Sequence, residues 1–261
     1  MKLDRPLVSF LLPIAPVSPW LAQTLMSLKN QTYSNWELIA VLDGQSTENV
    51  KIISDADLEN PVQILTHDVA LGIATSLNDG LKVAQGELIA RIDADDINLP
   101  TRLEQQVKSF LANPNLVLLG GSALVIDRYG LEAQAPRIVP TGVSVVSLRL
   151  LRRNALIHPT VMFRKEVVQR AGGYNPKCIR TEDYELWLRL ASFGEVDNLP
   201  EPILKYRVHP NQHTSGSAII SISEAAQIWQ SRKMLGAKLN QSKVKLLLNQ
   251  IIWLGNRYLR K

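Results

Sequence analysis

Residues 86–96 read Gly-Glu-Leu-Ile-Ala-Arg-Ile-Asp-Ala-Asp-Asp, an apolar run that ends in a cluster of acidic side chains. The run is short and bounded by polar residues, which predicts a buried strand over 88–92. Asp93, Asp95 and Asp96 follow it directly. Two such carboxylates about 5 Å apart repel by on the order of 3 kcal/mol at an effective dielectric of about 20.

A divalent cation would remove this repulsion, and hard oxygen ligands suit Mg²⁺ or Mn²⁺. The alternative is a solvated loop in which Asp96 or Asn98 caps the following helix. The tripeptide 93–95 alone does not separate the two interpretations. Its position directly after an apolar strand favours the metal site.

Strand and helix patterns alternate on both sides of this stretch. The predicted strands cover 7–12, 36–42, 62–65, 88–92 and 116–119, the last ended by Gly120-Gly121, and the predicted helices cover 21–28, 73–84 and 100–111. This alternation predicts an α/β fold with a mostly parallel, Rossmann-like sheet that carries helices on both faces. Ligand-binding loops follow the carboxyl ends of such strands, so Asp43 and the acidic cluster mark the expected site.

The alternation weakens after about residue 122. We therefore divide the sequence into a main domain over 1–217, with halves that meet near residue 121, and a helical tail over 218–261. In the second half and the tail, the patterns predict strands at 160–163 and 203–208, a helix over 181–193, a loop over 210–217, and helices that begin near Glu224 and Ser242.

The net charge of +5 is concentrated in the tail. The last acidic residue is Glu224, and eight basic residues follow it, so the chain up to Glu224 has a net charge of −3. Nucleic-acid binding across the main domain is not expected. The basic tail also carries an apolar run around 246–253. It suits a helix on an anionic membrane surface or a helix packed on the domain, and both alternatives stay open.

The compartment is indicated by what the sequence lacks. Cys178 is the single cysteine and forms no disulfide within the chain, which favours a reducing compartment. No stretch approaches about 18 uninterrupted apolar residues, so no membrane-spanning helix is expected. Residues 1–15 match a signal peptide in outline, but Asp4 and the nearby prolines favour a buried first strand. We expect a cytoplasmic protein, with peripheral contact at the inner face of the cell membrane left open.

The helix predicted over 181–193 carries acids in its first turn, where the helix dipole favours them. Asp183 shares a helical stripe with Leu186 and Trp187 and is expected to point inward. A partly buried carboxylate has a raised affinity for protons and suits a general base. Glu185 and Arg189 fall on another face at a spacing that allows pairing.

Several further side chains are weaker candidates. His158 alone is more often a structural histidine than a ligand. Arg207 suits a phosphate contact and His209 a third metal ligand, although both also fit an ordinary strand end. Trp187 and Trp229 are expected to pack in the interior rather than stack on a sugar.

Taken in order, these segments resemble the inverting glycosyltransferases of family 2, which have the GT-A fold. The resemblance runs from about residue 7 to 209, and the order and spacing of its blocks make it specific. The blocks are 8–13, 27–33, 36–39, 43–44, 86–96, 100 with 102–106, 158–160, 172–174, 182–189 and 206–207.

The resemblance implies roles on the nucleotide side. Asp93 and Asp95, with Ala94 between them, look like the motif that binds the donor and its metal, and Asp95 is the more direct ligand. Asp43 looks like the acid beside the nucleobase, and Pro13 lies on the loop that covers that base. The implied cofactor is Mn²⁺ or Mg²⁺.

On the acceptor side, Asp183 looks like the catalytic base and Glu182 its neighbour. His158 and Arg207 are candidates for contacts with acceptor or phosphate, and His209 completes the implied metal set. The implied reaction transfers a sugar from a nucleotide diphosphate sugar, with UDP favoured by the family. The implied acceptor is a hydroxyl of a glycan or a lipid-linked molecule, as in cell-surface polysaccharide synthesis. A single displacement would invert the anomeric configuration.

Three positions near the expected nucleotide depart from the family pattern. Leu42 stands where a second acid is usual, Ala70 replaces an asparagine, and 14–16 reads Ile-Ala-Pro where an asparagine usually follows. They leave the nucleotide open. A non-catalytic binding or scaffold module of the same fold is the alternative. A sugar-phosphate nucleotidyltransferase is disfavoured because 13–20 has no glycine-rich phosphate loop.

Overall fold

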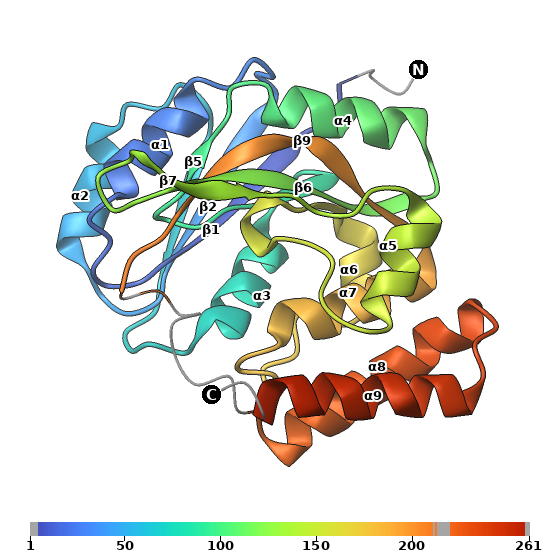
Figure 1. The fold of residues 1–261 in the computed structure, drawn as a ribbon. Coiled ribbons are helices and arrows are strands. Elements are labelled where there is room, and N and C mark those ends of the chain that lie inside the picture. Colours follow the sequence, from blue (N-terminus) through green and yellow to red (C-terminus); the bar gives the residue numbers. More distant parts are fainter. Residues whose placement is uncertain (1–4, 211, 213–219, 259–261) are drawn as a thin grey trace.

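A nine-stranded sheet runs through the residues that the computed structural model describes, which are 5–210, 212 and 220–258 (Figure 1). Its order is β3-β2-β1-β4-β8-β6-β9-β5, and β7 pairs with β6. The first four are parallel, β8 is antiparallel to β4 and β6, and β6 and β9 are parallel. The strands are β1 (Val8–Ile14), β2 (Trp36–Leu42), β3 (Val62–Thr66), β4 (Leu88–Arg91), β5 (Ile97–Asn98), β6 (Leu116–Ile126), β7 (Glu132–Arg137), β8 (Met162–Arg164) and β9 (Glu195–Arg207).

Helices cover both faces of this sheet, because the side chains of its central strands alternate between two cores. Phe10 and Leu12 belong to the core that α1 and α4 complete, whereas Leu11 belongs to the core under α3, α5 and α7. The helices are α1 (Leu21–Lys29), α2 (Thr47–Asp55), α3 (Ile73–Val83), α4 (Arg102–Ala112), α5 (Val143–Leu150), α6 (Lys165–Arg170), α7 (Glu182–Phe193), α8 (Ile222–Lys238) and α9 (Lys243–Tyr258).

The five strands predicted for the first half are all present, and α1, α3, α4 and α7 match the predicted helices. The prediction was wrong at the glycine pair, because β6 does not end there but runs on to Ile126. A Cβ atom at Gly121 would lie 2.7 Å from Ile203, and one at Gly120 would collide with Asn198. The glycines therefore let β9 approach β6 closely instead of ending the strand.

The second half is more regular than the sequence patterns indicated. The strand predicted at 203–208 is the end of β9, which begins at Glu195, and β8 begins after a 3-10 turn over His158–Thr160. The elements α2, α5, α6, β5 and β7 were not predicted. Most of the loop predicted over 210–217 lies outside the described residues.

The two tail helices were predicted, and they pack against α7, as Figure 1 shows. Ile228 of α8 and Trp253 of α9 are buried in the same core as Trp187. A capping box at Ser221 and Glu224 begins α8. The packing alternative for the tail is thus observed on one side of these helices. In the part of the chain described, no helix has the length and apolarity needed to cross a bilayer.

A buried polar cluster fixes the start of β4 beside β1 and β2. Ser9 Oγ donates to Glu37 Oε1 at 2.5 Å, and the amide of Gly86 donates to Ser9 Oγ at 2.8 Å. The amide of Gln85 donates to the same carboxylate at 2.6 Å. A Cβ at Gly86 would lie 2.6 Å from the backbone nitrogen of Ser9 and 2.8 Å from the carbonyl oxygen of Leu7. Only glycine therefore lets the chain enter β4 at this point.

We expect Gly86→Ala to lower the free energy of unfolding by about 3 kcal/mol. The new methyl group would overlap backbone atoms, which cannot rotate out of the way as a side chain can. Urea denaturation followed by circular dichroism measures this. The matched control is Gln85→Ala, which trims an exposed side chain and keeps the amide. Equal stability of the two variants would contradict the role assigned to this close contact.

Candidate active site

A cleft of about 440 Å³ opens at the carboxyl ends of β1, β2 and β4. It is lined by every residue that the sequence predicted for the donor and its metal, namely Pro13, Asp43, Asp93, Ala94, Asp95 and His209. This agrees with the rule that parallel strands bring their following loops to one edge. The lining also includes Trp20, Ser76 and Tyr206, which sequence reasoning missed. Trp20 was missed because a single aromatic residue after a proline-rich loop does not by itself indicate a binding site.

The three acidic side chains after β4 lie together, with Asp93 and Asp95 lining the cleft and Asp96 buried behind it. Asp93, Asp95 and Asp96 each offer a carboxylate oxygen, and these oxygens lie within 4.8 Å of one another. Arg91 holds the first of them through two contacts of 2.5 Å, one to each oxygen of Asp93. Arg91 is buried, whereas the Asp93 side chain is 30% exposed towards the cleft.

Asp95 faces His209 across the cluster, with 2.9 Å between Oδ2 and Nε2. Burial and the neighbouring charge of Asp93 raise the pKa of Asp95, although His209 counteracts this. The indole of Trp20 packs on the imidazole, with 4.5 Å between ring centroids, and so holds the ring towards the carboxylate.

Asp96 is the deepest member of the cluster. Its Oδ1 accepts from the Arg207 amide at 2.8 Å, while Oδ2 is buried without a hydrogen-bond partner among the described residues. Burial, and then the charge of Asp95, raise the pKa of Asp96 well above its ordinary value. An orphaned buried oxygen beside two further carboxylates and an imidazole suits a hard divalent cation. The residues present therefore fit the metal that the resemblance implied.

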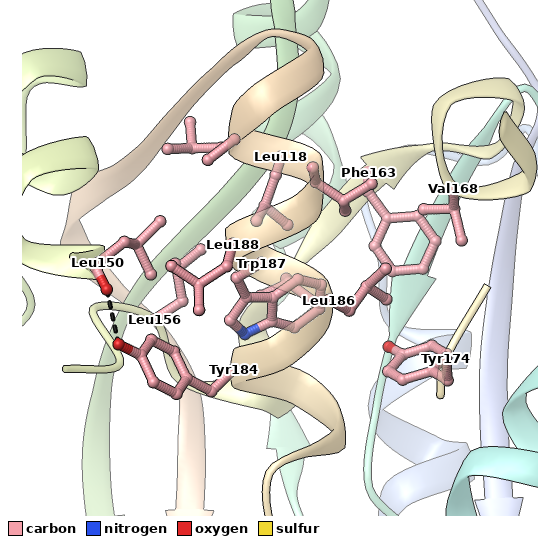
Figure 2. Packing of buried hydrophobic residues seen from close by; sticks show 14 of the residues in the cluster. Leu118, Leu150, Leu156, Phe163, Val168, Tyr174, Tyr184, Leu186, Trp187 and Leu188 are labelled. Atoms are coloured by element: carbon pink, nitrogen blue, oxygen red, sulfur yellow. Dashed lines mark hydrogen bonds between the residues drawn. The ribbon is translucent and has the colours of Figure 1, made fainter. Parts of the chain in front are cut away.

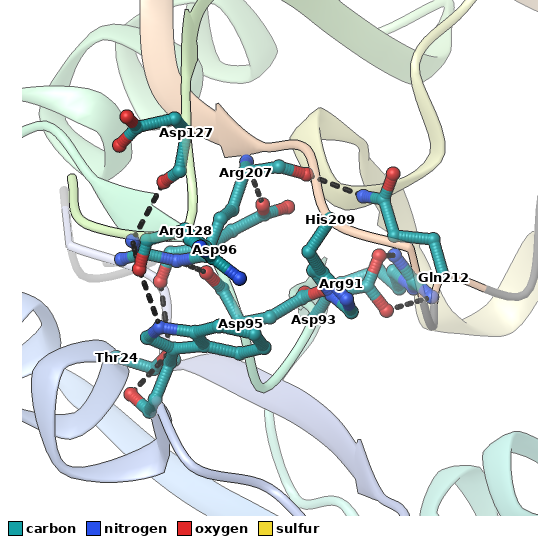
Figure 3. Close-up of polar contacts among 11 residues, drawn as sticks. Thr24, Arg91, Asp93, Asp95, Asp96, Asp127, Arg128, Arg207, His209 and Gln212 are labelled. Atoms are coloured by element: carbon teal, nitrogen blue, oxygen red, sulfur yellow. Dashed lines mark hydrogen bonds and ion pairs between the residues drawn. The ribbon is translucent and has the colours of Figure 1, made fainter. Parts of the chain in front are cut away.

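Arg207 is the structural centre of this region, as Figure 3 shows. Its Nε donates to the carbonyl of Asp95 at 2.8 Å, and one terminal nitrogen donates to the carbonyls of Asp127 and Arg128 at 3.1 and 3.3 Å. The other donates to Gln23 Oε1 at 2.8 Å. Arg207 thus ties the acidic loop to β9, to the turn after β6 and to α1. Its contact with acceptor or phosphate stays a prediction.

Asp43 organises the loop that follows β3. Its carboxylate accepts from the amides of Leu71 and Gly72 at 2.7 and 2.9 Å, and it lies 3.1 Å from His67 Nδ1. Burial opposes ionisation, but these donors outweigh it and lower the pKa of Asp43. The side chain lines the cleft and also fixes the entrance to α3, and its contact with a nucleobase stays a prediction.

Asp183 and Glu182 lie at the start of α7, outside the lining of the cleft. Asp183 Oδ2 accepts from Asn154 Nδ2 at 2.8 Å, and its Oδ1 accepts from the amide of Tyr184 at 2.5 Å. Burial raises the pKa of Asp183, while these two donors and the Arg91 guanidinium counteract it. Arg91 thus acts on the charges of both the cleft and α7.

Glu182 differs from its neighbour because its own backbone amide is the hydrogen-bond donor that counteracts burial. Its Oε2 is buried and has no partner among the described residues. Burial, and then the charge of Asp183, raise the pKa of Glu182 to about 8. Burial thus raises the pKa of both carboxyls, but two hydrogen-bond donors counteract this rise at Asp183.

Trp187 and His158, two further residues singled out from the sequence, lie in an aromatic cluster around α7. Trp187 is fully buried, as predicted, and packs beside Tyr174 and Phe163 (Figure 2). His158 lies against this group, with Nε2 3.0 Å from the hydroxyl of Tyr174. Burial lowers the pKa of His158 well below its ordinary value, so the ring is neutral. The structure places it in packing between β4 and α7, and any contact with acceptor stays a prediction. The predicted pair of Glu185 and Arg189 forms at 2.5 Å.

Comparisons by sequence and by structure both find glycosyltransferases. Residues 9–171 match the family described as Glycosyl transferase family 2. The chain is 35% identical over 190 residues to the amylovoran biosynthesis glycosyltransferase AmsE of Erwinia amylovora, with 72% of this chain and 70% of that one covered. It is 31% identical over 223 residues to the O-antigen biosynthesis glycosyltransferase WbnJ of Escherichia coli, with 82% and 84% covered.

Solved structures share the fold at low sequence identity. S. aureus TarS 1–349 in complex with UDP-GlcNAc superposes with a TM-score of 0.71 at 15% identity, over 96% of this chain and 72% of that one. The mannosyltransferase PcManGT from Pyrobaculum calidifontis, in complex with GDP-Man and Mn²⁺, gives 0.64 at 16% identity, over 98% and 76%.

The sheet order and these neighbours define the GT-A fold. The chain belongs to glycosyl transferase family 2.

We expect Arg207→Lys to lower the free energy of unfolding by about 3 kcal/mol. A single ammonium group cannot reach the carbonyls of Asp95, Asp127 and Arg128 together, so buried acceptors lose their donors. Urea denaturation measures the loss, and Arg128→Lys on the exposed neighbouring side chain is the control. A lysine variant as stable as the wild type would show that these contacts of Arg207 are dispensable for stability.

Glu182→Gln should remove a pH dependence of stability. The folded pKa of about 8 lies above the ordinary value of 4.5, so the protonated form stabilises the fold. That contribution is present below about pH 4.5 and is lost as pH rises to about 8. Between pH 5 and 9 the wild type should lose about 4 kcal/mol more than the variant.

Denaturant titrations at pH 5, 7 and 9 measure this difference. Glu166→Gln, on an exposed side chain of α6, is the control and should follow the wild type. Parallel pH curves for wild type and Glu182→Gln would contradict the raised pKa.

Proposed function

We propose that this protein transfers a sugar, with inversion, from a nucleotide diphosphate sugar to a hydroxyl of a glycan or lipid-linked acceptor in cell-surface polysaccharide synthesis. The observation that carries the proposal is the position of Arg91 and Asp93 between two sites. On one side is the cleft that holds the acidic cluster, and on the other are the carboxyls of α7. The names of the relatives, amylovoran and O-antigen biosynthesis, support the pathway.

The donor would lie in the cleft with its nucleoside between Pro13 and Asp43. Trp20 adds an apolar wall on the β1 side of the cleft. UDP is our first expectation, and UDP-GlcNAc in TarS supports it. GDP-mannose in PcManGT keeps GDP as the competitor, since Leu42 and Ala70 depart from the family pattern beside this pocket.

The diphosphate would lie over the acidic cluster. Asp95, Asp93 and His209 would hold Mn²⁺ or Mg²⁺, and Asp96 adds a fourth donor. A bound divalent cation supplies positive charge that neutralises a departing diphosphate. Repulsion within the cluster explains why this chain would take up such an ion.

Asp183 would act as the general base. The acceptor oxygen forms its bond to the anomeric carbon while its proton passes to the Asp183 carboxylate. The bond from that carbon to the phosphate oxygen breaks, and the nucleoside diphosphate leaves with the electron pair. Asn154 and the Tyr184 amide orient the base and favour its charged form. Because attack and departure occur on opposite faces of the sugar, one displacement inverts the anomeric centre.

Two variants separate donor binding from chemistry. We expect Asp95→Ala to weaken Mn²⁺-dependent nucleotide binding at least tenfold, because a cluster ligand is lost. Asp183→Asn should bind nucleotide like the wild type, while donor turnover falls by about 10²–10⁴-fold. Calorimetric titration of UDP and GDP, with and without Mn²⁺, measures binding, and nucleotide release from UDP- and GDP-sugars measures turnover.

The control is Asp55→Ala, which removes an exposed carboxylate at the end of α2 and should change neither quantity. Full turnover by Asp183→Asn would exclude this side chain as the base. Failure of the folded wild type to bind either nucleotide would instead favour the non-catalytic module.

A further inference from the structure

The tail helix α9 exposes a continuous apolar face. At about 100° per residue, five large aliphatic side chains fall on one side of it. Their exposed fractions range from 51% to 70%. They are Val244, Leu247, Leu248, Ile251 and Ile252. We call these five residues the outer face of α9.

The opposite side of α9 already makes the contacts that hold the helix in the fold. Leu246 and Trp253 are buried in the core shared with α7 and α8. Gln250 Nε2 donates to the carbonyl of Ala225 at 3.1 Å, and Gln250 also accepts from Arg232. The outer face is therefore not needed to attach the helix. Five aligned aliphatic side chains exposed to water indicate an interaction surface.

Charge around the outer face indicates the kind of partner. Lys243 and Lys245 are exposed and fall at the two edges of this face. No acidic residue follows Glu224 in the sequence, and Glu224 itself is buried in the cap of α8. An apolar stripe bordered by lysines matches the boundary between acyl chains and anionic headgroups.

Some basic residues of the tail already bind groups within the fold, so they do not contribute to contact with a membrane. Arg232 is fully buried and donates to the hydroxyl of Tyr184 at 2.9 Å. Lys238 donates to the carbonyls of Ala191 and Gly194 at the end of α7. These two cations attach the tail to the domain. Lys243 and Lys245, by contrast, are exposed beside the outer face, where they can meet a surface.

We propose that α9 docks the protein on an anionic lipid bilayer through its outer face, with Lys243 and Lys245 on lipid headgroups. A second copy of the chain suits the same face less well. An α9 pair would bring its lysines together without opposing carboxylates. The helix would lie in the interface, parallel to the membrane.

Docking on this face would bring a bilayer close to the acceptor side of the enzyme. Trp253 on the inner side of α9 contacts the ring of Tyr184, with 5.7 Å between centroids, and Tyr184 directly follows Asp183. A lipid-linked acceptor would then reach the base from the membrane surface. This consequence rests on the proposed function, whereas the docking itself does not.

The test uses the full chain and sedimentation with vesicles of phosphatidylcholine alone or mixed with phosphatidylglycerol. The wild type should bind the anionic vesicles, and the double variant Leu247→Ser/Ile251→Ser should bind at least tenfold more weakly. Lys243→Gln/Lys245→Gln should also weaken binding, and added salt should do the same to the wild type. The matched control is Val145→Ser/Leu148→Ser, which removes two exposed aliphatic side chains from α5.

Calorimetric nucleotide binding is measured on every variant. It should not change, so a failure of docking is distinguishable from a failure of the proposed function. Equal vesicle binding by the wild type and Leu247→Ser/Ile251→Ser would overturn the proposal, as would no binding by the wild type. A dimer in sedimentation equilibrium that only the α9 variant dissociates would overturn it in favour of a second copy.

Discussion

The repulsion among three carboxylates in one short loop is the constraint on which this structure depends. Asp93, Asp95 and Asp96 each place a carboxylate oxygen within 4.8 Å of the others, and the fold brings these charges together. The surroundings of the three carboxylates differ. The first is paired with the buried guanidinium of Arg91, the second faces His209, and burial raises the pKa of the third well above its ordinary value. The charge that remains is concentrated at the floor of the cleft, where a cation and a diphosphate would meet it.

The cluster can exist only when the whole sheet is assembled. Arg207 lies at the end of β9, yet its donors reach the carbonyl of Asp95 and the turn at 127–128, and its amide holds Asp96. Arg91 sits at the end of β4 and acts on the charges of the cleft and of Asp183. The two halves of the main domain therefore share one electrostatic centre, although the regular alternation of strands and helices is confined to the first.

Sequence patterns predicted the elements whose environment is local. Short apolar runs predicted β1 and β2, and parallel strands carry Asp43 and the acidic cluster to one edge. The patterns failed where distant neighbours decide. A Gly-Gly pair is typical of a turn, but here Gly121 makes room for Ile203 of β9. Arg207 was recognised as a cation, but nothing in its own segment indicates that its partners are carbonyls of residues near 95 and 127.

The two acids of α7 show the same limit at the level of chemistry. From sequence alone, both are favoured as anions by the helix dipole, and spacing only orients Asp183 inward. In the fold, burial outweighs the dipole for Glu182, whose Oε2 has no donor among the described residues, and its pKa rises to about 8. Asp183 keeps two donors, which counteract the rise in its pKa that burial causes. The two carboxyls therefore differ because of Asn154 and the Tyr184 amide, and the position of Asn154 beside Asp183 depends on the tertiary fold rather than on the spacing of residues within the helix.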